Sequence, residues 1–268
     1  MATQTQAARA RRAGPRAAPA ALAPQQTPAP EQAPSPAVPP LRRAAAEIVG
    51  TAALVTVVVG SGIQATRLSQ DTGVQLLANV LATALALWVL ITLLAPVSGA
   101  HLNPVVTLAD WWSARGGPTA YGVRTVALYV AAQTAGAIAG AVLADAMFDR
   151  PLISWSTHDL SAAHLLLGEA VATAGLVLLV TGLVRSGRTQ PVPAAVAAYI
   201  GAACWCTSSG SFANPAATVG RAFSDTFAGI APGSLPGFLA AQLTGTAAGL
   251  ALAAALFPSG RPFREDPC

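Results

Sequence analysis

The stretch Ser98-Gly99-Ala100-His101-Leu102-Asn103-Pro104-Val105-Val106-Thr107 decides the fold, together with the similar stretch Ser211-Phe212-Ala213-Asn214-Pro215-Ala216-Ala217-Thr218. In each, Asn suits the N-cap of a helix and Pro suits the first helical position, where its missing N–H would have no partner. The apolar runs that follow, 105–112 and 216–223, are about two turns long, whereas a bilayer crossing needs ~20 residues. Because irregular backbone at membrane depth is tolerated only where protein covers it or it lines a watery cavity, we predict two re-entrant half-helices around a pore or binding site.

The composition indicates a membrane protein with several spans. The chain is 53% hydrophobic and 10% charged, whereas soluble domains carry about 25% charged residues. All fifteen basic residues are Arg, and they lie at the ends of apolar runs, so membrane topology explains the basic charge better than nucleic-acid binding. The Cys and His residues show no disulfide framework, metal spacing or nucleophile–base pair. We therefore expect no metal, no cofactor and no enzymatic activity.

Six apolar spans and two half-helices follow one another along the chain. We predict spans at about 44–63, 74–94, 121–147, 164–184, 190–208 and 235–257, with half-helices at 103–113 and 214–223. These would form one channel domain over 41–258. Residues 1–40, rich in Ala, Pro, Gln and Arg, predict a disordered basic tail, and 259–268 a short second tail. The first tail could bind anionic lipid, although a solvated tail that sets topology is the simpler interpretation.

The arginine distribution predicts the orientation. With the N-terminus inside, twelve of the fifteen arginines fall in cytoplasmic segments: Arg9, Arg11, Arg12, Arg16, Arg42, Arg43, Arg115, Arg124, Arg185, Arg188, Arg261 and Arg264. The outer segments hold Arg67, Arg150 and Arg221. We therefore expect a multi-pass protein of a bacterial cell membrane with both termini in the cytoplasm.

An internal repeat relates the two halves, about 44–148 and 164–257. Residues 131–148 and 240–257 are identical at ten of eighteen positions, which include Gln133/Gln242 and two pairs of glycines. Each half has a Glu-bearing span, a second span, an Asn-Pro half-helix and a Gln-bearing span. Because three crossings place the second half on the opposite face, the repeat must be inverted. Asn103 and Asn214 would then meet near the midplane.

These residues together resemble the aquaporin, or major intrinsic protein, family. The resemblance rests on SGAHLNPVVT, the second Asn-Pro-Ala box, the paired Glu spans and the paired Gln spans, and covers about residues 44–257. It implies an all-α, inverted-repeat fold of six transmembrane helices and two half-helices. It also implies a passive channel for water and small uncharged solutes that assembles as a homotetramer in the lipid bilayer.

The resemblance also implies roles for individual residues. The two pore boxes would be Asn103, Pro104 and Val105, and Asn214, Pro215 and Ala216. Backbone carbonyls that bind solute would come from Gly99, Ala100, His101, Leu102, Gly210, Ser211, Phe212 and Ala213. Glu47 and Glu169 resemble buried carboxylates that hold loop backbone N–H groups, although an intramembrane carboxylate can also relay protons. Gln133 and Gln242 would bond across helices.

The selectivity filter departs from the family pattern. Where most members have an Arg after the second Asn-Pro-Ala, this chain has Ala217. By the family's spacing the other filter positions fall on Thr83, Ala202 and Ser211, none of them aromatic or charged. Arg221, one turn further along the same face, could place a cation at the outer vestibule or could be a surface residue. We expect an aquaglyceroporin-like pore that admits glycerol, urea or neutral metalloid acids such as arsenite.

An inverted-repeat secondary transporter of a small solute is the alternative. It would show saturation and coupling to proton or sodium flux, and would need more intramembrane charge than Glu47, Glu169 and Asp145 supply.

Overall fold

The computed structural model describes residues 38–115, 117 and 120–257, and these residues form helices without any strand. Five helices are long and apolar enough to cross a membrane: α1 (Pro40–Leu68), α2 (Thr72–Ser98), α4 (Val123–Met147), α5 (Ala163–Arg185) and α8 (Leu235–Leu256), which continues the 3-10 turn η1 (Pro232–Ser234). The predicted all-helical membrane fold is thus confirmed. The expected tails, apart from 38–40, lie outside the described residues.

Helix α6 (Val192–Cys206) is shorter than the span predicted at 190–208. Pro191 and Pro193 place its start, and the chain is already extended at Thr207. Its 15 residues span about 22 Å, which is less than the ~30 Å of a hydrocarbon core. The polar segment 207–211 replaces the last helical turn and leads directly into the second half-helix.

The two half-helices lie where the sequence predicts them. They are α3 (Pro104–Ala114) and α7 (Pro215–Arg221). The Asn103 side chain accepts a hydrogen bond from the Val105 N–H at 3.0 Å, and the Asn214 side chain accepts from the N–H groups of Ala216 and Ala217 at 3.1 and 3.2 Å. Each Asn is thus an N-cap with Pro at the next position.

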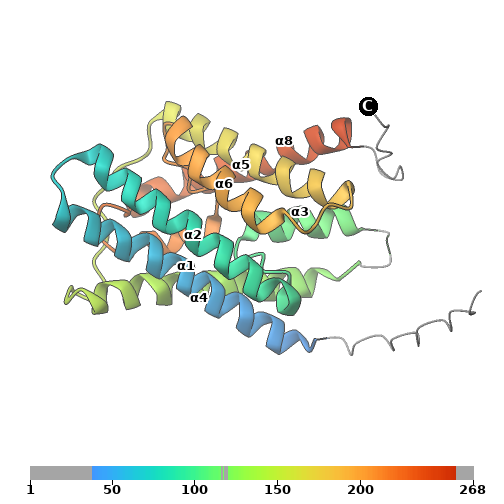
Figure 1. Cartoon of the computed structure of the whole chain (residues 1–268), viewed down its shortest axis with the longest axis horizontal. Coiled ribbons are helices and arrows are strands. Elements are labelled where there is room, and N and C mark those ends of the chain that lie inside the picture. Colours follow the sequence, from blue (N-terminus) through green and yellow to red (C-terminus); the bar gives the residue numbers. More distant parts are fainter. Residues whose placement is uncertain (1–37, 116, 118–119, 258–268) are drawn as a thin grey trace, which may run out of the picture. The chain divides into compact units, whose positions relative to one another are not determined.

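Glycines set the packing of the long helices in pairs, with α1 beside α4 and α5 beside α8 (Figure 1). A Cβ on Gly136 or Gly140 would strike the α1 carbonyl of Ile48 or Ala52. A Cβ at the equivalent α8 positions, Gly245 and Gly249, would likewise strike α5 carbonyls. The same close approach recurs in both halves, as expected for a repeat with small residues at helix contacts.

The connection between the halves, residues 148–162, lies against the segment that follows α7. The Ser154 and Ser156 N–H groups donate to the carbonyls of Phe223 and Ala222 at 2.9 and 3.0 Å. The Ala231 N–H donates to the His158 carbonyl at 2.7 Å. These bonds bring His158 and Leu160 to one end of the cavity described below.

Candidate functional site

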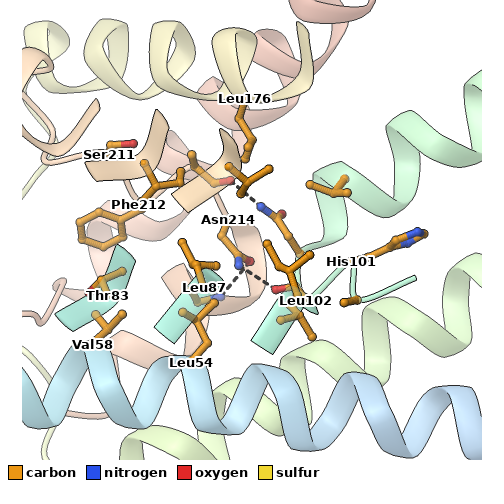
Figure 2. Close-up of a pocket in the computed structure, with 18 of the residues that line it drawn as sticks. Leu54, Val58, Thr83, Leu87, His101, Leu102, Leu176, Ser211, Phe212 and Asn214 are labelled. Atoms are coloured by element: carbon orange, nitrogen blue, oxygen red, sulfur yellow. Dashed lines mark hydrogen bonds between the residues drawn. The ribbon is translucent and has the colours of Figure 1, made fainter. Parts of the chain in front are cut away.

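Asn103 and Asn214 exchange hydrogen bonds at the centre of the site. Asn103 Nδ2 donates to the Ala213 carbonyl and Asn214 Nδ2 donates to the Leu102 carbonyl, both at 2.8 Å (Figure 2). Each amide oxygen is already occupied by its own helix N-terminus, so both side chains have one fixed orientation. The amide NH2 carries two N–H groups, and the described residues pair one of them on each Asn.

The loops before the two Asn residues share an unusual backbone. Ala100 and Leu102 have φ of 47° and 51°, and Ser211 and Ala213 have φ of 52° and 45°. Such left-handed conformations cost about 1–3 kcal/mol at non-glycine residues and persist only where the surroundings impose them. Gly99 and Gly210, with φ of 90° and 72°, begin each loop and adopt this region without strain.

Glu47 holds the first loop in this conformation. Its carboxylate accepts hydrogen bonds from the His101 and Leu102 N–H groups at 3.0 and 2.7 Å and from Ser98 Oγ at 2.6 Å. Gln133 Nε2 donates to the same carboxylate at 2.7 Å. Glu47 is fully buried, and four donors compensate the cost of burying its charge.

Glu169 holds the second loop in the equivalent way. It accepts a hydrogen bond from the Phe212 N–H at 3.2 Å, and another from the Ala213 N–H. Gln242 Nε2 donates to Glu169 at 2.8 Å and to Thr218 Oγ1 at 2.8 Å. Gln133 makes the matching bond to Thr107 Oγ1 at 3.0 Å. Both glutamines therefore bond across helices, from α4 to α1 and α3, and from α8 to α5 and α7.

A cavity of about 850 Å³ passes between the two halves and past both Asn side chains. Its wall is mostly aliphatic; Leu54, Val58, Leu87, Ile91, Leu176, Val180, Val196 and Ile200 belong to it. Figure 2 shows His101 toward one end and Thr83, Ser211 and Phe212 toward the other, with Asn214 and Leu102 between them. The lining extends from Thr189 and Gln190 at the α3 end to His158 and Gly229 at the α7 end.

The structure brings most of the predicted pore residues to this cavity. Asn103, Asn214, Gly99, Ala100, His101, Leu102, Gly210, Ser211, Phe212 and Ala213 all line it. The carbonyls of Leu102 and Ala213 already accept the Asn amides, so each keeps only one lone pair for a solute. The other box residues do not line it: Pro104, Val105 and Ala216 are buried and Pro215 is half-buried behind the lining.

Three of the four predicted filter positions line the cavity, and the structure corrects the fourth. Thr83, Ser211 and Ala217 are lining residues, whereas Ala202 is exposed on the far side of α6. The same helix lines the cavity through Val196, Ile200 and Cys204, which are spaced by four residues. Ala202 lies half a turn from this face, so counting back from Asn214 missed the rotation of α6.

Arg221 also lines the cavity. Its guanidinium lies 3.3 Å from the centroid of the Phe212 ring, and its Nε–H donates to the Ala228 carbonyl. The Phe212 ring in turn packs edge-on against Phe238, with 5.1 Å between centroids. The sequence alone left open whether Arg221 faces the pore or the surface. The structure places it in the cavity wall, one helical turn beyond Ala217.

The α3 end of the cavity carries a second polar group. Asp110 lines the wall and accepts a hydrogen bond from Tyr121 Oη at 2.9 Å. Asp110 Oδ2 lies 3.8 Å from His101 Nε2, and His101 Nδ1 lies 3.1 Å from Thr107 Oγ1. Asp110 was not expected from the sequence, although its place seven residues, about two turns, after Asn103 on the same half-helix is a signal that could have found it. His158 and Leu160 were not expected because the connecting segment is far along the chain from both Asn-Pro boxes.

Comparisons with known proteins agree with this geometry. The profile of the major intrinsic protein family matches residues 35–207. Aquaglyceroporin AqpS of Rhizobium meliloti (strain 1021) is 47% identical over 221 residues, covering 82% of this chain and 92% of that protein. A probable aquaporin, TIP3-2, of Oryza sativa subsp. japonica is 33% identical over 202 residues, covering 72% and 74%.

A solved structure shares the fold. The aquaglyceroporin from Plasmodium falciparum superimposes with a TM-score of 0.59 at 20% identity, covering 82% of this chain and 96% of that one. The family profile covers more than half of the chain, and the match to the rhizobial relative covers more than four fifths of it. Together with the paired Asn-Pro half-helices and the cavity between them, these matches show that the chain belongs to the major intrinsic protein family, and that it is a multi-pass membrane channel and not an enzyme.

Proposed function

We propose that the channel conducts water and small uncharged solutes larger than water, such as glycerol, urea or undissociated metalloid acids like arsenite. One observation carries the proposal: the filter positions that line the cavity hold only the small side chains Thr83, Ser211 and Ala217. Small, uncharged side chains at these three positions leave room for a three-carbon polyol. The rhizobial relative, an aquaglyceroporin by name, supports the same solute class.

The wall chemistry also supports an uncharged polyol. Aliphatic side chains such as Leu54, Leu87 and Leu176 offer contact to carbon atoms, while loop carbonyls and the Asn amides offer hydrogen bonds to hydroxyl groups. A mostly apolar lining with a few polar groups is typical of small-molecule sites. A bare ion would lose its hydration along this wall without compensation.

Asn103 and Asn214 have the geometry to interrupt a proton wire. A solute oxygen that accepts the second N–H of each amide points its own hydrogens away from the centre, so a continuous chain of water hydrogen bonds is broken there. The N-terminus of α3 adds a partial positive charge that opposes cations. Both effects require the fixed amide orientation that the exchanged hydrogen bonds provide.

Stopped-flow light scattering on proteoliposomes tests the proposal. Gradients of sucrose, glycerol, urea and arsenous acid would be imposed in turn. We expect fast shrinkage in sucrose and fast re-swelling with glycerol. Asn214→Asp is the control, because a carboxylate cannot donate to the Leu102 carbonyl, and we expect its flux to fall. Water flux without re-swelling by any of the other solutes would contradict the solute class, and saturating flux coupled to a proton gradient would indicate a transporter instead.

We further propose that the protein forms a homotetramer in a bacterial cell membrane, with both termini in the cytoplasm. Membership of the family supports the assembly, and the arginine distribution supports the orientation. The mass of the detergent-free complex, measured by light scattering in lipid nanodiscs, would distinguish a tetramer from a single chain.

A further inference from the structure

We infer that Arg221 is the charged selectivity residue of this pore and that it excludes cations from a position one helical turn beyond Ala217. The inference rests on the proposed function, because it assigns selectivity to the same channel. Cation exclusion is thereby assigned to one side chain at one place on the cavity wall. Its effect on ion leak can be measured separately from solute flux.

Within the described part of the chain, one arginine lines the cavity. Of the described residues that line it, Arg221 is the only arginine and Asp110 the only carboxylate. They lie on different half-helices, α7 and α3, so Asp110 cannot neutralise the guanidinium. In the described part of the chain no carboxylate forms an ion pair with Arg221. Glu169 attracts Arg221 electrostatically but from beyond ion-pair distance, and its carboxylate is bonded to the second loop. The positive charge of Arg221 therefore still acts on the interior of the pore.

The guanidinium is held in one place by uncharged partners. The Phe212 ring lies against its face, the Ala228 carbonyl accepts its Nε–H, and Phe238 packs edge-on against the Phe212 ring. An arginine stacked on an aromatic ring loses little of its charge, since the ring offers only a quadrupole. The arrangement therefore fixes the position of the cation without cancelling its field.

The register of α7 brings Arg221 to the wall. Ala217 and Arg221 are separated by four residues and so share one face of the helix. Gly220, between them, packs so closely on Ala137 of α4 that a Cβ would collide with that backbone. This contact fixes the rotation of α7 and directs the Arg221 face toward the cavity. Because the arginine stands at 221 and not at 217, the pore stays wide at the filter positions. A fixed positive charge still lies along the solute path.

The test compares ion leak with solute flux in proteoliposomes. The Arg221→Ala variant would be reconstituted beside the wild type, with Na⁺ leak followed by a sodium-sensitive dye and H⁺ leak by pyranine under a potassium clamp. We expect the Na⁺ leak to rise at least about tenfold, the effect of one unit charge about 10 Å away at an effective dielectric constant of about 20. We also expect glycerol flux to rise, because a bulky side chain is removed.

Three further variants separate charge from fold. Arg67 provides the matched control: it also bonds a carbonyl, that of Phe148 at 2.9 Å, and stacks on the Phe148 ring, but it does not line the cavity. We expect Arg67→Ala to leak no more than the wild type. Arg221→Lys keeps the charge and should keep the leak low. Ala217→Arg combined with Arg221→Ala returns a charge to the wall and should restore ion exclusion while reducing glycerol flux.

The possible failures are distinguishable. If wild-type vesicles pass neither water nor glycerol, the proposed function is wrong. If the wild type conducts but Arg221→Ala leaks no more than Arg67→Ala, the function stands and the inference about Arg221 is overturned. A high leak in Arg221→Lys would also overturn it, because shape and not charge would then matter.

Discussion

At the scale of single residues, the two buried carboxylates have the largest consequences. Glu47 accepts four hydrogen bonds, two of them from backbone N–H groups of the loop, and one of these belongs to the strained Leu102. Glu47→Gln would place an amide NH2 against at least one of these donors. We expect this change to destabilise the fold by about 2–4 kcal/mol. Thermal unfolding in detergent, followed by size-exclusion chromatography, would measure it.

A matched carboxylate on the surface provides the control for that prediction. Asp71 caps α2 by accepting a hydrogen bond from the Val74 N–H at 2.9 Å, and Asn can make the same bond. Asp71→Asn should therefore leave the unfolding temperature nearly unchanged. Equal stability of Glu47→Gln and the wild type would mean that the loop does not depend on the carboxylate.

The sequence predicted some of these residues and not others, for physical reasons. Glu47 and Glu169 stand out because ionisable groups are rare in apolar spans. Ala202 was misplaced because spacing along the chain does not determine how α6 is rotated. The contact of Arg221 with Phe212 could not be anticipated, since it depends on the path of the chain after α7 and on the carbonyl of Ala228.

At the scale of elements, glycine contacts between helices set the separation of α1 and α4. A Cβ on Gly140 would collide with the Ala52 backbone, whereas a Cβ on Gly201 of α6 would meet nothing closer than 3.8 Å. We expect Gly140→Ala to cost about 1–3 kcal/mol by overpacking. Gly201→Ala should be neutral or stabilising by up to about 1 kcal/mol. Measured side by side, the melting temperature of Gly140→Ala should therefore fall, whereas that of Gly201→Ala should stay the same or rise.

Asp225 makes an acid-sensitive contact with the connecting segment. Asp225 accepts hydrogen bonds from the Thr157 N–H and hydroxyl at 2.9 and 3.1 Å. The backbone bond from Thr157 lowers the pKa of Asp225 below its usual 3.8. Because the folded pKa is depressed, this contact stabilises the segment at pH values above 3.8 and is lost as the pH falls through the folded pKa.

Trp155 fluorescence would report that loss. Its ring packs on Phe223, 4.7 Å between centroids, within the same segment. The other tryptophans, Trp88, Trp111, Trp112 and Trp205, would be changed to Phe. We expect the Trp155 emission to shift only below about pH 4, and Asp225→Asn to show part of that shift at neutral pH. A midpoint near pH 6 would exclude Asp225 as the responsible group.

At the scale of the whole molecule, topology is the testable property. The arginines of residues 1–40 predict that this segment lies in the cytoplasm. Trypsin should therefore cut at Arg9, Arg11, Arg12 or Arg16 in inside-out vesicles and leave these four sites uncut in right-side-out vesicles. Cleavage with the opposite preference would invert the proposed orientation.

The order of the elements could be read from the sequence because each half repeats the same pattern, but the packing of residues 148–162 had no counterpart in the repeat.

The exchange of hydrogen bonds between Asn103 and Asn214 also has a consequence for biosynthesis. When the ribosome has completed residues up to about 150, the Asn103 amide and the Leu102 carbonyl have no partner, because Ala213 and Asn214 have not yet been made. The loop of the first half therefore lacks these two hydrogen bonds until the second half has been made. Two fragments divided between 148 and 162 and made together should therefore complete each other's hydrogen bonds and form the cavity.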